Sequence, residues 1–172
     1  RDFCLSRGLG DVYKRQAKGI QNIAYLGSNM DQMVNRCRYQ GYEEAYRKGK
    51  RKLNQDLVYT DLSSRAMVEK AVEELKNSGV ECILCQDDYI CDEVVRKLAR
   101  MGVRIPDQMK VASCHYSRIL ENYPVTITSL KFNITELGRR SCQVLLDMIH
   151  GKTVPDKTLL DYEIILKEST KG

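Results

Sequence analysis

The stretch Cys82-Ile83-Leu84-Cys85-Gln86-Asp87-Asp88-Tyr89-Ile90, which runs on to Gly102-Val103-Arg104-Ile105-Pro106, decides the fold class of this 172-residue chain. Its apolar start is too short for a helix and is bounded at once by polar residues, which indicates a buried strand. Apolar residues then recur at helical spacing, and Gly102 is placed to end that helix in a left-handed turn. The stretch is therefore one strand–helix unit of a parallel sheet. Ligands of such sheets bind outside the carboxyl ends of the strands, here at Gln86 to Tyr89.

The rest of the chain repeats this alternation. Strands are predicted at residues 20–27, 57–60, 109–114, 126–130 and 159–166, and helices at residues 31–48, 63–79 and 133–149. Ser63 or Ser64 is expected to cap the second of these helices, and Asn133 the third. The inward face of the first helix is assigned to Met30, Val34, Cys37, Gly41 and Ala45, with Gly41 approaching the sheet closely. The alternation predicts an α/β fold, with a parallel sheet in a three-layer lobe and right-handed crossovers.

The bulk properties describe an ordinary globular chain. Apolar residues make up 42% and charged residues 30% of the sequence, and the formal net charge is +5. Residues 1–16 carry four basic and two acidic side chains, so residues 17–172 carry a charge of only +3, spread without a block. This is weak evidence for direct nucleic-acid binding. No apolar run approaches the ~20 residues that span a membrane, so no membrane partner is expected.

Residues 1–16 show no sustained period and do not lead naturally into the strand that follows. The run from Cys4 to Gln16 resembles a translated adaptor of the kind seen at the ends of assembled environmental reads. We therefore expect residues 1–16 to be a leader that is non-native or disordered, and no function rests on it. A genuine mobile leader is the alternative.

Seven cysteines with irregular spacing favour reduced thiols in the cytoplasm over a disulfide framework. Cys82 and Cys85 form a C-x-x-C pair, which is the spacing of many metal and redox sites. Residues three apart on a strand point to opposite faces, however, so the two thiols cannot easily chelate one ion, and a redox pair would instead open a helix. We interpret both as buried packing residues, and the sequence predicts no metal site and no cofactor.

A set of landmarks runs through the chain in order. They are Ile23-Ala24-Tyr25-Leu26-Gly27, Arg38-Tyr39-Gln40-Gly41-Tyr42, Cys85-Gln86-Asp87-Asp88, Gly102-Val103-Arg104-Ile105-Pro106-Asp107, Ile127-Thr128-Ser129-Leu130, Leu137-Gly138 and Lys167-Glu168-Ser169-Thr170. Each alone is weak. Together they make residues 18–170 resemble the effector-binding core of bacterial transcription regulators of the lactose-repressor (LacI/GalR) family. The resemblance implies a periplasmic-binding-protein-like type I fold, in which two similar lobes clamp the effector between them.

The resemblance also divides the chain. Residues 17–131 and 152–170 match the C-terminal lobe, and residues 132–151 match a helix that belongs to the first lobe in the family. The N-terminal helix-turn-helix domain and most of the first lobe have no counterpart in the sequence, so we expect a truncated effector-binding domain. The apolar face of the helix at residues 133–149 should then be under-covered.

The candidate ligand-binding residues come from the same resemblance. Arg38 matches the arginine of the family's R-x-x-G-[YW] motif, and its planar guanidinium suits fork-like bonding to adjacent hydroxyls or a carboxylate. Asp87 matches a ligand-binding asparagine or aspartate at the end of a strand, and Asp88 beside it is assigned as the helix cap. The alternatives are a solvated arginine and two aspartates that merely cap the helix.

His115 marks a departure from the family. After the fourth strand the family usually carries glycine, an aromatic residue and then an acidic residue that binds effector hydroxyls, whereas this chain reads Ser113-Cys114-His115-Tyr116. The position has lost a carboxylate and gained a mostly neutral group that can donate or accept a hydrogen bond. His115 and Tyr116 are assigned to the ligand site. Tyr89 is assigned there too, stacking on a sugar face, although an exposed helix tyrosine explains it as well.

Three functions fit these residues. The leading hypothesis is a cytoplasmic effector sensor without catalytic residues: a small metabolite, such as a sugar or sugar derivative, closes two lobes and biases DNA binding by a separate helix-turn-helix domain of a homodimer. The second is a solute-binding protein of a sugar importer, which shares the fold but would meet an oxidising periplasm. The third is an enzyme that uses Asp87, Asp88 and His115, but the sequence has no nucleophile elbow, phosphate-binding glycine loop or spaced metal-ligand set.

Overall fold

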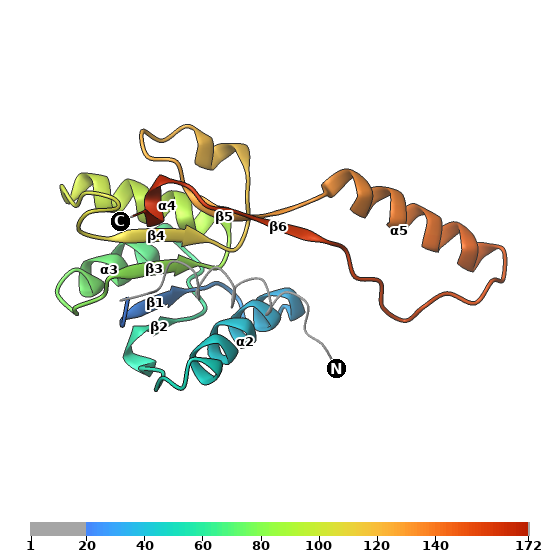
Figure 1. Cartoon of the computed structure of the whole chain (residues 1–172), viewed down its shortest axis with the longest axis horizontal. Helices are drawn as coiled ribbons and strands as arrows, with labels where there is room; N and C mark the ends of the chain where they lie inside the picture. Colours follow the sequence, from blue (N-terminus) through green and yellow to red (C-terminus); the bar gives the residue numbers. More distant parts are fainter. Residues whose placement is uncertain (1–19, 172) are drawn as a thin grey trace.

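The chain builds one mostly parallel sheet with helices on both faces (Figure 1). The computed structural model describes residues 20–171, so the predicted leader at residues 1–16 lies outside the described residues. The strand order is β2-β1-β3-β4-β5-β6, in which β6 alone runs antiparallel to its neighbour. The elements are β1 (Ile23–Leu26), α2 (Met33–Lys48), β2 (Val58–Tyr59), α3 (Arg65–Leu75), β3 (Cys82–Cys85), α4 (Asp88–Arg100), β4 (Lys110–Ser113), β5 (Thr128–Phe132), α5 (Ile134–Ile149) and β6 (Tyr162–Ile165), with short 3-10 turns at Gln55–Leu57, Arg118–Glu121 and Glu168–Thr170. The predicted α/β class is confirmed.

The β3–α4 unit follows the predicted layout except at its cap. β3 is fully buried, and Gly102 has a φ of +68°, the left-handed conformation expected just after the end of α4. The Ile90 amide donates a hydrogen bond to the Asp87 carboxylate at 2.9 Å, so Asp87 is the N-cap. The assignment of Asp88 as the cap was wrong. The backbone is still extended at Asp87 and helical from Asp88, and the last extended residue is the one whose side chain can turn back to an amide of the first turn.

Two apolar clusters pack against the two faces of the sheet. α3 and α4 cover one face, and α2 covers the other. Cys85 belongs to the first cluster and Cys82 to the second, as expected for strand residues three apart, and both thiols are free and buried. Their interpretation as packing residues is confirmed.

The inward face of α2 differs from the predicted one. The structure buries Gly41, Tyr42 and Tyr46. Val34, which the prediction placed on the inward face, is exposed. The predicted face contained small and aliphatic residues but no tyrosine. A tyrosine ring nevertheless buries a large apolar area when its hydroxyl has a hydrogen-bond partner. The Tyr42 hydroxyl does so by donating to the Ile23 carbonyl at 2.7 Å.

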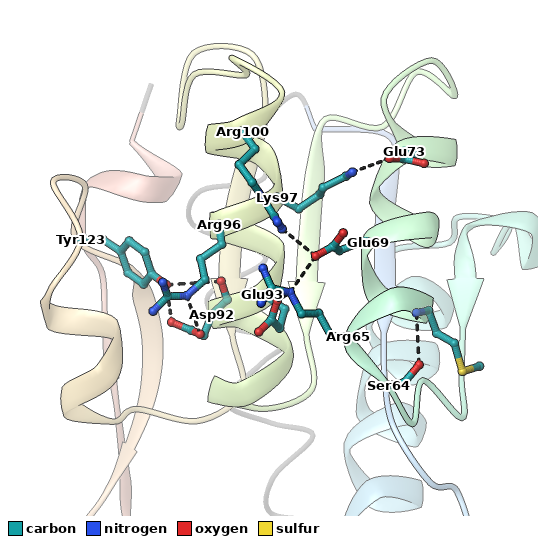
Figure 2. A network of polar contacts seen from close by, with 11 residues as sticks. Ser64, Arg65, Glu69, Glu73, Asp92, Glu93, Arg96, Lys97, Arg100 and Tyr123 are labelled. Carbon is teal, nitrogen blue, oxygen red and sulfur yellow. Dashed lines mark hydrogen bonds and ion pairs between the residues drawn. The ribbon is translucent and has the colours of Figure 1, made fainter.

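Ion pairs cover the outer surface of α3 and α4 (Figure 2). Glu69 accepts hydrogen bonds from Arg65 at 2.8 Å and from Arg100 at 2.7 Å. Asp92 accepts a hydrogen bond from Tyr123, in the segment before β5. Each exposed pair adds little because water screens it, but together they tie α3 to α4 and α4 to the segment before β5.

α5 stands apart from the sheet. Asn133 caps it as predicted, accepting a hydrogen bond from the Glu136 amide at 3.0 Å, and Gly151 follows its end with a φ of +71°. No residue of α5 is buried, and Figure 1 shows the helix reaching away from the sheet. Its exposed large apolar side chains are Ile134, Leu137, Leu145, Leu146, Met148 and Ile149. The under-covered apolar face is therefore present, yet within residues 20–171 no helix is long and apolar enough to cross a membrane.

Candidate functional site

Three polar loops meet at the carboxyl edge of the sheet. They follow the neighbouring strands β1, β3 and β4 and comprise residues 27–32, 86–87 and 114–117. Because parallel strands end at the same edge, side chains that are far apart in the sequence are brought together there. Asp87 comes from the second loop, His115 from the third, and Arg38 from the helix that follows the first.

Gln86 holds the first two loops together. Its side chain is fully buried, and its Oε1 accepts hydrogen bonds from the Ser28 amide at 3.0 Å and the Tyr25 hydroxyl at 3.3 Å. Its Nε2 donates to the Ser28 hydroxyl at 3.1 Å. This close approach requires glycine at residue 27, since a Cβ there would lie 2.5 Å from the Gln86 Oε1 and 2.7 Å from the Tyr25 ring. The first loop is thereby fixed to the end of β3.

Arg38 and Asp87 act on the same buried groups. Burial raises the pKa of the Cys114 thiol to about 12, while the Arg38 charge lowers that pKa and the Asp87 charge raises it. Burial also raises the pKa of the Tyr25 hydroxyl. Here too the Arg38 charge lowers the pKa and the Asp87 charge raises it. Both charges therefore lie within electrostatic reach of one region of the sheet edge. Within residues 20–171 Arg38 forms no hydrogen bond or ion pair, so its donors are available to a ligand.

His115 pairs with Asp88. Its Nδ1 lies 3.2 Å from the Asp88 Oδ1, and the two side chains are 31% and 24% exposed. Burial alone would raise the pKa of Asp88, but the neighbouring Ser117 hydroxyl and the hydrogen bond with His115 outweigh burial and hold that pKa below its usual range. The sequence indicated that position 115 has lost the family's carboxylate and gained a mostly neutral group. The structure adds a carboxylate next to that group, since Asp88 contacts the His115 ring.

A hollow of about 580 Å³ opens beside His115, between β5, β6 and the start of α5. Its lining includes Phe132 and Lys131 of β5 and Asp161 and Glu163 on the β6 side. The Phe132 ring lies nearly parallel to the His115 ring, with the centroids 6.2 Å apart and the planes at 29°. An apolar ring beside a few polar groups is typical of small-molecule sites.

The two predicted tyrosines differ in their surroundings. Tyr116 lines the hollow, but Lys131 Nζ lies 5.5 Å and Lys167 Nζ 5.2 Å from its ring centroid, and its hydroxyl donates to Glu121. Tyr89 lies in the first turn of α4 with 58% of its surface exposed. Tyr116 is therefore engaged by protein charges, whereas the Tyr89 ring is open at the edge of the site.

Sequence reasoning missed two residues of this region. Gln86 was placed at the carboxyl end of its strand and within a landmark, but its role in holding two loops together was not predicted. Phe132 carried no such signal, because its strand was predicted to end at Leu130 and instead runs to Phe132. Among the described residues, no group of His, Cys, Asp or Glu side chains is arranged to hold a metal ion.

A parallel sheet between helical layers, with polar loops gathered at the carboxyl edge, is the arrangement of the open α/β folds whose ligands bind outside the carboxyl ends of the strands. Residues 16–170 match the family described as the periplasmic binding protein-like domain, and the chain belongs to that family. It is similar to the HTH-type transcriptional regulator GntR of Pseudomonas aeruginosa, with 27% identity over 161 residues that cover 90% of this chain and 46% of GntR. A LacI-family transcriptional regulator from Bifidobacterium animalis has a TM-score of 0.84 at 21% identity, covering 96% of this chain and 61% of that one. The complex of the transcriptional regulator CelR with cellobiose has a TM-score of 0.80 at 23% identity, and the match covers 96% of this chain and 49% of the CelR chain.

These similarities confirm the predicted relation to the lactose-repressor family and the periplasmic-binding-protein-like fold. The chain spans about half the length of the curated relatives that it matches. Those relatives are transcriptional regulators and not enzymes, which agrees with the predicted absence of a catalytic role.

Proposed function

We propose that this chain is the effector-sensing part of a bacterial transcriptional regulator. A small metabolite binds at the carboxyl edge of the sheet, between this lobe and a first lobe, and its binding biases a helix-turn-helix domain. The observation that carries the proposal is the gathering of Arg38, Asp87 and the His115–Asp88 pair at one edge of the sheet, where His115 also lines the hollow. These groups are charged or polar and only partly buried, as a ligand site requires.

The effector in this proposal is a sugar or a sugar derivative. The donors of Arg38 and the acceptors of Asp87 suit hydroxyl groups. The Phe132 ring beside His115 offers an apolar surface to the carbon face of a sugar ring. A similar structure, that of CelR, holds cellobiose, which supports this ligand class.

α5 is assigned to the first lobe in the proposal. Residues 132–151 would pack there, while residues 17–131 and 152–170 form the present lobe. The exposed apolar side chains of α5 support this division, because an apolar face of this kind normally marks an interface.

The intact regulator would act in the cytoplasm and would contact DNA only through its helix-turn-helix domain. A homodimer would read two half-sites symmetrically. The four buried free thiols within residues 20–171 suit a reducing compartment, whereas a solute-binding protein of an importer would meet an oxidising one. The gene upstream of this chain discriminates between the two, since it encodes either a helix-turn-helix domain or a signal peptide.

A thermal-shift screen of the full-length gene product tests the proposal. Sugars, sugar phosphates and nucleobases are screened, and a ligand at a hundred times its Kd should stabilise the protein by about 2.7 kcal/mol. Stabilisation by a sugar is expected. A protein that binds none of these compounds, or whose DNA affinity does not change with the bound compound, would contradict the proposed function.

Matched variants then test the site. Arg38→Ala should weaken binding by about tenfold or more, because a hydrogen bond to a charged group contributes ~1.5–3 kcal/mol. Arg47→Ala, at the exposed end of the same helix, is the control and should leave affinity unchanged. Asp87→Ser removes the carboxylate while keeping a residue that can cap α4. Unchanged affinity in both Arg38→Ala and Asp87→Ser would show that the site is assigned wrongly.

A further inference from the structure

Asp88 reaches His115 from a different element of the fold. Asp88 is the first residue of α4, and His115 lies in the loop after β4, yet their nearest side-chain atoms are 3.2 Å apart. Ser113 fixes that loop separately, since its hydroxyl donates to the His115 carbonyl at 2.8 Å and accepts from the His115 amide at 3.2 Å. Phe132 lies against the imidazole ring. The ring is therefore held with Nδ1 toward Asp88. His115 lines the hollow, and within residues 20–171 its Nε2 forms no hydrogen bond.

Asp88 is an ionised carboxylate at neutral pH. Although burial would raise its pKa, the neighbouring Ser117 hydroxyl and the hydrogen bond with His115 keep that pKa below the ordinary range. An ionised carboxylate only accepts hydrogen bonds, so the ring nitrogen that faces it has to carry a proton. In a neutral imidazole, a proton on Nδ1 leaves a lone pair on Nε2.

We propose that Asp88 is a positioning residue that holds His115 in the tautomer with its proton on Nδ1, so that Nε2 acts as a hydrogen-bond acceptor toward the hollow. The proposal rests on the proposed function and deepens it, because it names the group of the effector that His115 takes. That group is a hydroxyl or N–H donor. A carbonyl or phosphate oxygen in the same place would meet a lone pair and would be rejected.

Nitrogen NMR of the ligand-free full-length protein, carrying isotope-labelled histidine, tests the tautomer directly. The signals of His115 are assigned by their loss in His115→Gln. The pH is raised until the His115 ring carries a single proton. Nδ1 should then be protonated and Nε2 unprotonated, with the two tautomers in a ratio of about ten to one or more. A neutral ring protonated on Nε2, or an even mixture of the two tautomers, overturns the proposal.

Variants of Asp88 test the cause of the preference. Asp88→Asn keeps the shape of the side chain, but its amide can present either an oxygen or an NH₂ group, so the ratio should fall toward a mixture. Asp88→Ala should have the same effect. Asp92→Asn removes another carboxylate from the same helix, one that pairs with Arg96 and Tyr123, and should leave His115 unchanged. An unchanged ratio in both Asp88 variants overturns the proposal.

This experiment is independent of the effector screen. The tautomer is read without any ligand, so a failed screen would contradict the proposed function and leave the role of Asp88 intact. A wrong tautomer would contradict the role of Asp88 and leave effector binding intact.

Discussion

Replacing Gln86 by leucine should destabilise the protein by roughly 2–4 kcal/mol. The substitution keeps most of the side-chain volume but removes three hydrogen bonds of a fully buried amide. The Tyr25 hydroxyl is buried and cannot exchange Gln86 for water, and an orphaned buried group of this kind costs ~1–3 kcal/mol. The Ser28 amide and hydroxyl are only part-buried and can regain water, so their loss adds roughly 1 kcal/mol.

A double-mutant cycle separates the orphaned hydroxyl from the other effects. Tyr25→Phe removes the hydroxyl itself, so the combined variant has no orphaned group at that point. Its free energy of unfolding should therefore be higher, by about 1–2 kcal/mol, than the value expected from adding the destabilisations of the two single variants. Urea unfolding followed by circular dichroism measures the free energies of unfolding.

The matched control is Gln40→Leu, at an exposed glutamine of α2, which should change stability by less than about 0.5 kcal/mol. If the effects of Gln86→Leu and Tyr25→Phe add to within ~0.5 kcal/mol, the two side chains are not coupled and the reasoning is refuted.

Three further outcomes are expected. Gly27→Ala should lower thermal stability by about 1–3 kcal/mol, because the added Cβ meets the Gln86 Oε1 at 2.5 Å and the side chains have to shift. Asp88→Asn should lower the free energy of unfolding above about pH 4. The difference from wild type should disappear at lower pH. A carboxyl whose pKa is lowered in the folded state contributes stability that is lost as the pH falls through that pKa. Thiol titration of the folded Cys4→Ser variant should modify accessible cysteines rapidly and buried ones only after unfolding, since burial blocks access and raises the pKa of Cys82 and Cys114 to about 12. The rapid group is Cys37 and Cys142, and the slow group is Cys82, Cys85, Cys91 and Cys114.

Each of these expectations has a contradicting result. Gly138→Ala is the control for Gly27→Ala, because a Cβ at residue 138 meets nothing within 4 Å, and equal effects of the two substitutions would rule out the steric argument. A stability difference for Asp88→Asn that persists at the lowest pH would show that the ionised carboxylate is not its source. Rapid modification of Cys82 in the folded protein would contradict its packing role.

Much of the fold could be predicted because its signals are local. Ser64 and Asn133 cap the helices that follow them, and Gly102 adopts the left-handed conformation, as their positions in the sequence indicated. These roles depend on residues within one turn of the backbone, so periodicity and residue type suffice. The division of α2 into faces could not be predicted in the same way. A tyrosine such as Tyr42 is buried only where its hydroxyl finds a partner, and that partner, the Ile23 carbonyl, lies on another element.

The stretch from Cys82 to Pro106 by itself determined a strand, a polar turn and a helix, and hence an α/β sheet with polar residues at its carboxyl edge. It did not determine which aspartate caps α4, because the cap depends on where the extended backbone turns helical, a shift of one residue. Only the tertiary structure brought Asp88 to His115. The parallel register that sets Cys85 beside Ser113 places the following loops next to each other, and so joins two side chains 27 residues apart in the sequence. Pairing between strands is a non-local property, and the chemistry of this site depends on it.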